Sequence, residues 1–318
     1  SSGRIDYAVR VLTCPATASL RESNCKQYGT GGSISYKPTG ILHDFGETAS
    51  VDEAPRMYFG LVTGSQPNNL RGGVLRQNLS SFGDEIDPST GQFLTTVDGI
   101  VRTLDRFRMI GGGYQGTVGN SNWAWGNGTG NCPSVGNRAI DNGECRMWGN
   151  PIGEMMFETL RYYAGAAAAT PSYAAGGASQ GSTEETTLGL TAPAWKDPYA
   201  AVGNNGLGFR SCQKPVVTVI SDVNPSYDSD VPGNGWTSAT FISPTTISDF
   251  SLETQGAAMW QNEFGAGSRS VFIGQTGTTA SDGAPTIKSA SSFGTIRGLS
   301  PEEPSKGCLL YTSPSPRD

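Results

Sequence analysis

The sequence predicts an α/β domain with a doubly wound, mostly parallel sheet and long glycine-rich insertions. Three observations carry this prediction. Residues 149–165 have the apolar spacing and end signals of a helix. The later run "PVVTVI", at 215–220, is apolar throughout, which is typical of a strand covered on both faces. The order helix, connection, buried strand is that of α/β folds.

Three earlier segments also carry element signals. Residues 4–12 alternate well enough to predict a strand, and residues 56–64 predict a second, more buried one. An amphipathic helix is expected from residue 97 to 107, where apolar residues recur at helical spacing. These residues are Val97, Ile100, Val101, Leu104 and Phe107.

The helix at 149–165 has the strongest signals in the chain. Asn150 is a good N-cap, Pro151 suits the first helical position, and Gly165 can adopt the left-handed conformation that ends a helix. An apolar stripe on this helix is expected to face the core. Its members are Ile152, Met155, Met156, Leu160 and Tyr163.

The domain is expected to cover residues 1–234 and to be incomplete at both ends. A small-residue, low-complexity insertion occupies 166–189, and an irregular segment at 235–307 is expected to lead to a further C-terminal module. Residues 308–318, "CLLYTSPSPRD", read as the translation of a sequencing-library adapter, so they are left out of the fold.

The composition indicates an exported protein. Charged residues make up 16% of the chain, and 44 residues are glycine, which fits a loop-rich exported protein better than a helical cytosolic enzyme. The net charge of −6 supplies no basic field for phosphates, so nucleic acid is not expected as a partner. The sequence contains no run of about 18 unbroken apolar residues, so no transmembrane helix is predicted.

The cysteines favour an oxidising compartment. Cys14 with Cys25, and Cys132 with Cys145, each bracket a short turn-rich segment, as local disulfides do. The alternative is reduced thiols in a cytosolic protein. Cys212 has no evident partner. With one histidine and no CxxC motif, a zinc site lacks ligands.

The segment after the apolar run is the candidate metal site. It supplies oxygen donors of the kind that Mg²⁺ and Ca²⁺ prefer, at the edge of a parallel sheet where ligands bind. The alternative is an Asx-type turn with solvated acids. The donors are Asp222, Asn224, Ser226, Asp228 and Asp230.

The segments "GNPIGEMM" and "VVTVISD" resemble the second half of a von Willebrand factor A domain. In that family a Thr before the helix and an Asp after the strand hold a divalent cation, and here Asn150 and Asp222 stand at those positions. The resemblance therefore implies a site for Mg²⁺ or Ca²⁺ at Asp222 and Asn150, and Asn224, one of the oxygen donors above, is expected to be the third ligand. Val223 replaces the usual glycine, and the family's Asp-x-Ser-x-Ser loop is not found upstream.

A closer resemblance covers residues 7–307. "VRVLTCPATASLRESNCKQYG", "WGNPIGEMMFETLRYYAG" and "CQKPVVTVISDVNPSYDSDVPG" follow one another as in PilY-type proteins, the tip-associated adhesins and assembly factors of type IV pili. The resemblance implies a non-catalytic protein of the bacterial surface, exported to the periplasm, outer membrane and pilus tip. It implies minor pilins or the tip complex as partners, and a host or abiotic surface as the target of adhesion.

Three further site hypotheses stand beside the metal site. Trp123, Trp125 and Trp148 lie in or beside a turn-rich excursion and suit recognition, or else they cover the domain's own surface. An exported hydrolase is the alternative function, because "GASQG" at 177–181 fits a nucleophile elbow, although His43 lies upstream of it. Three arginines could clamp an anion, but solvation or pairing with acids is the expected role. They are Arg71, Arg76 and Arg161.

Overall fold

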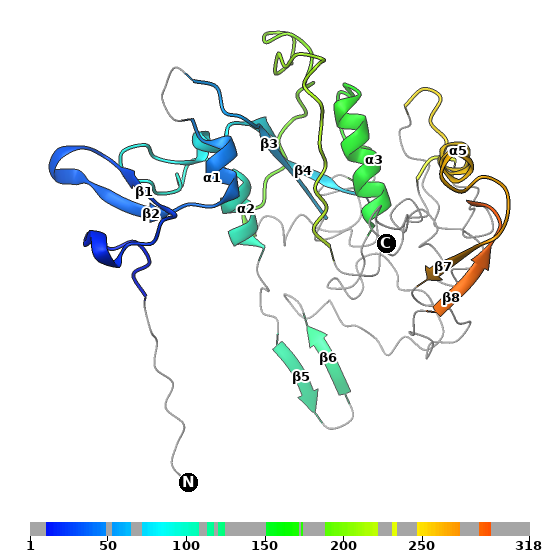
Figure 1. The fold of residues 1–318 in the computed structure, drawn as a ribbon, viewed down its shortest axis with the longest axis horizontal. Coiled ribbons are helices and arrows are strands. Elements are labelled where there is room, and N and C mark those ends of the chain that lie inside the picture. Colours follow the sequence, from blue (N-terminus) through cyan, green and yellow to red (C-terminus); the bar gives the residue numbers. More distant parts are fainter. Residues whose placement is uncertain are drawn as a thin grey trace. The chain divides into compact units, whose positions relative to one another are not determined.

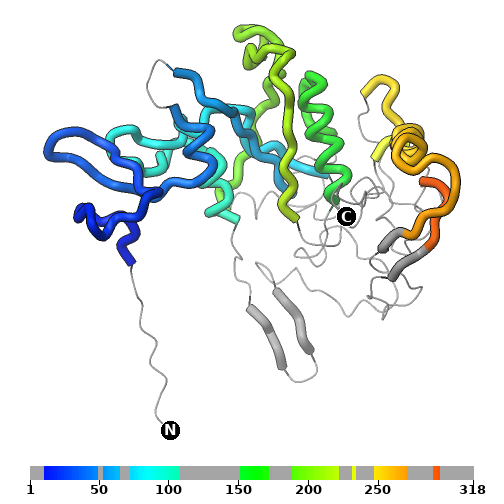
Figure 2. Tube along the Cα trace, in the orientation of Figure 1, coloured from blue at the N-terminus to red at the C-terminus, as the bar shows by residue number. Residues whose placement is uncertain are grey.

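The chain folds as two compact units, each with its own hydrophobic core. Residues 1–60 and 79–105 form the first unit, and residues 61–78 and 106–318 form the second. The computed structural model describes residues 11–48, 53–64, 72–107, 113–117, 120–124, 151–171, 173, 188–221, 231–233, 247–273 and 286–293 (Figures 1 and 2). Only the backbone is described for 113–117, 120–124, 271–273 and 286–288.

The first unit is built from a hairpin and short helices. β1 (Cys25–Tyr28) pairs antiparallel with β2 (Ser35–Pro38), with Cys25 opposite Pro38. The helices are η1 (Ala18–Leu20), η2 (Gly31–Ser33), α1 (Ile41–Gly46), η3 (Phe82–Glu85) and α2 (Ile100–Arg106), whose last residue belongs to the second unit. The strand expected at 4–12 lies almost wholly outside the described residues, and its last two residues, Val11 and Leu12, are exposed.

The core of the first unit explains where α2 begins. Tyr28, Phe82 and Ile86 are buried together. Next to them, the buried Glu85 carboxylate accepts hydrogen bonds from the backbone N–H groups of Ile100 (2.8 Å) and Val101 (3.1 Å). A carboxylate satisfies the free N–H groups of a helix start and suits its dipole. The helix expected at 97–107 is thus confirmed for 100–106.

His43, the single histidine of the chain, packs into the first unit. Its Nδ1 accepts a hydrogen bond from the Gly40 N–H at 3.3 Å, and its ring meets the Phe82 ring edge-on at 5.0 Å between centroids. Because Nδ1 accepts this bond, the ring must be deprotonated at that atom. Burial in turn lowers the pKa of His43 below its ordinary value, although Glu47 acts in the opposite direction.

We expect the pKa of His43 in the folded chain to lie below about 6.5, its value in unfolded peptides. Folding lowers this pKa, so at a pH above the pKa of the unfolded chain the neutral ring contributes fully to the stability of the fold. That contribution to stability is lost as the pH falls through the pKa of the folded chain. Following the ring C–H resonance by NMR against pH measures the value, and the single histidine makes its assignment unambiguous. A midpoint at or above 6.5 would contradict the burial argument.

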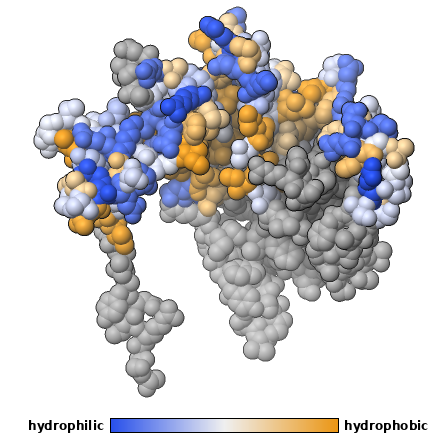
Figure 3. All heavy atoms as spheres, viewed as in Figure 1, coloured by the Kyte–Doolittle hydropathy of each residue, from blue (hydrophilic) through white to orange (hydrophobic). Residues whose placement is uncertain are grey.

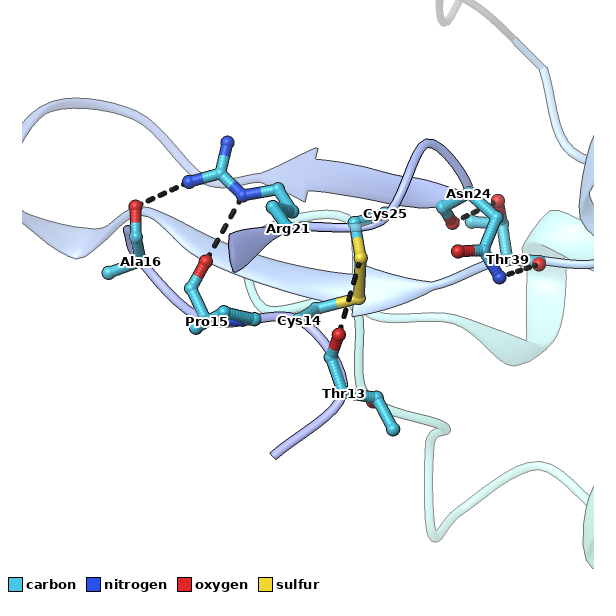
Figure 4. Close-up of a disulfide and its surroundings, with 8 residues drawn as sticks. All are labelled: Thr13, Cys14, Pro15, Ala16, Arg21, Asn24, Cys25 and Thr39. Carbon is cyan, nitrogen blue, oxygen red and sulfur yellow. Dashed lines mark hydrogen bonds between the residues drawn. A yellow bond between two sulfur atoms is a disulfide. The ribbon is translucent and has the colours of Figure 1, made fainter. Parts of the chain in front are cut away.

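The predicted disulfide between Cys14 and Cys25 is confirmed. It closes a loop with a sequence separation of 11 and a Cα–Cα distance of 5.7 Å (Figure 4). Arg21 ties this loop further, since its guanidinium donates to the carbonyl oxygens of Pro15 (Nε, 3.1 Å) and Ala16. The same guanidinium lies over the Tyr36 ring of β2, 3.2 Å from the centroid. The disulfide and this cation–π contact together fix the loop against the hairpin.

Replacing both Cys14 and Cys25 by serine is expected to lower the free energy of unfolding of the first unit by about 2–3 kcal/mol. The physical reason is that a closed loop of this size restricts the unfolded chain, and removing the bond restores that freedom. Urea unfolding followed by hydrogen exchange of unit-one amides measures the change. Cys212→Ser is the matched control, because Cys212 is exposed and unpaired. Equal midpoints for both variants would refute the stabilising role.

The strands of the described residues form four two-stranded sheets. β3 (Phe59–Thr63) lies beside β4 (Val74–Ser80), whereas β5 (Gly113–Thr117) with β6 (Asn120–Ala124), and β7 (Arg269–Ile273) with β8 (Thr286–Ala290), are antiparallel hairpins. The chain therefore mixes helices and strands as expected, and β3 confirms the strand predicted at 56–64. The expected doubly wound parallel sheet is not formed by the strands described. Nor is any described helix long and apolar enough to span a bilayer.

The core of the second unit joins α3 (Ile152–Tyr163) to α5 (Leu252–Phe264). The ring of Phe157 in α3 lies 4.8 Å from the ring of Phe250, measured between centroids. Within α5, the rings of Trp260 and Phe264 lie 4.8 Å from each other. The buried members of the cluster are Phe157, Val231, Leu252, Trp260, Ala290 and Phe293.

Helix α3 confirms the predicted element but corrects which face is buried. It starts at Ile152, so Pro151 precedes the helix instead of being its first residue, and Gly165 follows it with φ +77° as expected. The expected core stripe is wrong in part, because Met156 and Leu160 are 36% and 43% exposed. The buried positions after Ile152 are instead Gly153, Glu154, Phe157, Glu158, Arg161 and Tyr162.

The run at 215–220 is not a strand of a sheet in this chain, which corrects the central-strand prediction. It is extended backbone without a strand partner, and all its side chains are exposed (yellow-green in Figure 1). Its composition indicates burial on both faces, but burial requires neighbouring strands. The described residues of this chain supply none.

Candidate functional site

The three predicted metal ligands, Asp222, Asn150 and Asn224, lie outside the described residues. The nearest described residues in sequence are Ser221, which precedes Asp222, and Pro151, which follows Asn150. Among the residues that the structure describes, no three or more His, Cys, Asp or Glu side chains cluster as metal ligands would. The cation site therefore remains a prediction from the sequence.

The predicted binding residues are also outside the described part of the chain. Trp125 and Trp148 are not described, and Trp123 contributes only its backbone, as a residue of β6 opposite Tyr114. The predicted Cys132–Cys145 disulfide lies outside the described residues as well, as does the "GASQG" segment at 177–181.

The most developed polar site of the described residues is buried under α3. Nη1 of Arg161 donates to both carboxylate oxygens of Glu158, at 2.8 and 3.0 Å, one helical turn away. Thr170 completes the group, since its N–H and hydroxyl donate to the Glu158 carboxylate at 2.9 and 2.7 Å. Nη2 of Arg161 donates to the Ala168 carbonyl at 3.1 Å. Each charge is buried and hydrogen-bonded, as a buried ion pair requires.

A second buried carboxylate extends this group along the same helix. The carboxylate of Glu154 accepts a hydrogen bond from the Gly72 N–H. Gly72 has φ +50°, and a Cβ there would run into the Tyr173 ring, so only glycine fits beside that buried tyrosine. Polar side chains of α3 thereby hold two loops that are distant in sequence, one at residue 72 and one at residues 168–173.

Aromatic rings cover the arginine. The Arg161 guanidinium lies 5.6 Å from the centroid of the Trp195 ring, and Tyr162 meets Trp195 edge-on at 5.7 Å. Both terminal nitrogens of this buried guanidinium are hydrogen-bonded, whereas its buried Nε has no hydrogen-bond partner among the described residues. The paired charge and the aromatic neighbour stabilise the structure. Of the two roles considered for Arg161, pairing with an acid is therefore confirmed, and solvation is wrong.

Of the other two arginines considered as anion clamps, the structure describes only Arg76. Arg76 is buried, with Nε donating to the Thr63 hydroxyl at 2.9 Å and Nη1 to the Thr191 carbonyl at 3.2 Å. It thus binds backbone and hydroxyl groups of its own unit. Arg71 lies outside the described residues.

The Glu154, Glu158 and Arg161 group was missed by sequence reasoning, although a signal for it was present. The three residues are spaced i, i+4 and i+7, which places them on one helical face. That spacing fits an exposed polar face equally well. What buries this face is contact with loops at residues 72 and 170, which no local pattern reveals.

Comparison with known proteins defines the class of this chain. The family model described as "PilY1 homolog, second domain" matches residues 59–312, so the chain belongs to this family. The type IV pilus biogenesis factor PilY1 homolog of Xylella fastidiosa (strain Temecula1 / ATCC 700964) is 43% identical over 322 residues, which cover 98% of this chain. The predicted resemblance to PilY-type proteins is thereby confirmed.

The extent of these similarities limits what they transfer. The chain spans about a fifth of the length of the Xylella relative. No solved structure matches the chain. Membership of the family is therefore inferred from sequence similarity, whereas the fold is taken from the structure described above.

Proposed function

We propose that this chain is a non-catalytic binding and assembly module of a type IV pilus biogenesis factor, acting at the pilus tip. The single observation that carries the proposal is the 43% identity to the Xylella biogenesis factor across nearly the whole chain. The partners proposed are minor pilins or the tip complex, together with a host or abiotic surface.

Export is the second part of the proposal, to the periplasm, the outer membrane and the cell surface. The Cys14–Cys25 disulfide supports it, because disulfides persist in oxidising compartments and are rare in the cytosol. Immunogold labelling of a tagged full-length protein on intact cells tests both export and position. Label at pilus tips is the expected result, and label confined to the cytoplasm or spread along the shaft would contradict it.

Adhesion is proposed to depend on Trp123, Trp125 and Trp148. Replacing all three by alanine in the full-length protein is expected to leave pili assembled but to reduce attachment of piliated cells several-fold, because exposed aromatic rings supply much of the contact energy at interfaces. Val202→Ala is the matched control, an exposed apolar residue of the same unit. Attachment equal to that of the control, with pili counted by electron microscopy, would remove the binding role.

A cation is proposed to be held by Asp222, Asn150 and Asn224. Their carboxylate and amide oxygens are donors that suit Mg²⁺ or Ca²⁺, and a bound ion would fix the loop that follows the 215–220 run. Calorimetric titration of the chain with each ion tests this, comparing Asp222→Asn with Asp249→Asn. Asp249 is an exposed carboxylate of the same unit with φ +62°, a conformation that asparagine also adopts. Equal binding by both variants would remove the site.

A von Willebrand A-like sheet is proposed for the complete region of the native polypeptide. Helix α3 and the apolar run at 215–220 support this proposal, since both segments carry the resemblance. Among the strands that the structure describes, none pairs with this run.

A further inference from the structure

The family match and the fold divide this chain at different places. The family model begins at residue 59, whereas the first compact unit joins residues 1–60 to residues 79–105. Residues 79–105 therefore belong to the family's second domain by sequence, but they fold together with residues that precede the match. A domain has its own hydrophobic core, and few contacts cross its boundary. The contacts between 11–48 and 79–105 show which boundary is physical.

The core of the first unit is shared between these two segments. Phe82 and Ile86, which are 1% and 4% exposed, come from the later segment, and the buried Tyr28 comes from the earlier one. Leu42 of the earlier segment and Val101 of the later one pack against this cluster. Without the earlier segment, Phe82 and Ile86 would lose the cover that Tyr28 and Leu42 provide, which is unfavourable for apolar side chains in water.

Polar contacts join the same two segments in both directions. The Ser35 hydroxyl of the earlier segment donates to the Thr90 carbonyl at 2.7 Å. The Ser81 hydroxyl of the later segment donates to the Gly46 carbonyl at 2.9 Å. Each segment thus satisfies a backbone carbonyl of the other, as groups inside one folded domain do.

The β1–β2 hairpin fits closely against the later segment. Gly91 has φ +67°, and a Cβ there would run into the Tyr28 ring of β1, so this contact requires glycine. The residues around β1 and β2 are mostly hydrophilic on the face shown in Figure 3. The hairpin therefore buries Tyr28 against the later segment and presents polar residues to water.

We propose that the later segment carries an interaction surface, formed by Phe82, Ile86 and Val101, whose partner is the segment 25–47 of the same chain. The domain that the family model describes then begins before residue 59. The similarity to the Xylella relative supports this extension, because it covers 98% of this chain and so includes residues before 59. This inference does not depend on the function at the pilus tip.

A nicked chain tests the proposal. A protease recognition sequence inserted after the exposed Ala54 allows the folded chain to be cut into residues 1–54 and 55–318. The Cys14–Cys25 disulfide lies within the shorter fragment, so it does not join the two pieces. After the cut, the fragments are expected to elute together at the size of the uncut chain in size-exclusion chromatography.

Hydrogen exchange gives separation of the fragments a clear meaning. The amides of Ile86 and Thr103 donate within the later segment, to the carbonyls of Gly83 and Gly99. If the fragments separate and these amides keep their slow exchange, the later segment folds alone and the proposal is overturned. If they separate and exchange becomes fast, the later segment depends on 25–47, as proposed.

A pair of variants identifies the surface. Tyr28→Ala should raise the dissociation constant of the cut fragments at least about tenfold, because it removes a buried ring from the shared core. Leu20→Ala is the matched control, as Leu20 is 70% exposed in the same fragment. Equal dissociation constants for the two variants would overturn the proposal. So would an uncut chain with the mass of two copies that falls to one in Tyr28→Ala, since the partner would then be a second copy.

Discussion

Replacing Arg161 with methionine is expected to lower the free energy of unfolding of the second unit by about 3–5 kcal/mol. The substitution leaves the Glu158 carboxylate buried and without its cation. An unpaired charge inside a protein costs far more than the loss of the attraction alone, because water cannot reach it. Thr170 can still donate two hydrogen bonds to that carboxylate, which reduces the loss but supplies no charge.

Urea unfolding at neutral pH measures this change, with Arg210→Met as the matched control. Arg210 is an exposed arginine of the same unit, so its substitution is expected to change stability by less than about 0.5 kcal/mol. Indistinguishable unfolding of the two variants would show that the Glu158–Arg161 pair contributes nothing. A loss confined to Arg161→Met would establish the buried pair as a main support of α3.

Replacing Phe157 with alanine is expected to lower stability by about 3–5 kcal/mol, through lost apolar burial and the cavity that remains. Phe157 is 3% exposed and connects α3 to Phe250 and the α5 cluster. Met156→Ala, at the adjacent position, is the control. Since Met156 is partly exposed, its loss should be less than about 1 kcal/mol. Thermal unfolding measures both losses. A larger loss for Met156→Ala than for Phe157→Ala would support the apolar stripe predicted from the sequence over the buried face seen in the structure.

Local signals predicted two helices and one disulfide of this chain, but they did not predict α1 or α5, and α5 (Leu252–Phe264) lies in the segment that was expected to be irregular. The apolar spacing at 97–107 and 149–165 led to α2 and α3, because helices depend mainly on contacts between near neighbours. The Cys14–Cys25 pair followed from the short turn-rich segment between the two cysteines. In each case the decisive residues lie within about 20 positions of one another.

Non-local contacts decided what the sequence did not predict. Glu158 and Arg161 are buried because Thr170 and Ala168 fold back over α3, and no periodicity encodes that return. The run at 215–220 was expected in a sheet because its composition favours a strand. Composition does not show whether neighbouring strands are present to pair with it. The candidate metal residues follow from their oxygen donors and from a resemblance, and the tryptophans follow from their turn-rich surroundings. Both sets stay predictions.

The Cys14–Cys25 bond also governs how this part of the protein responds to mechanical tension. A polypeptide pulled from both sides of the loop transmits the force through the sulfur atoms, so the residues between them do not lengthen. With a separation of 11 residues and 5.7 Å between the Cα atoms, about 30 Å of slack stays out of reach. A tether shortened in this way passes tension on instead of absorbing it.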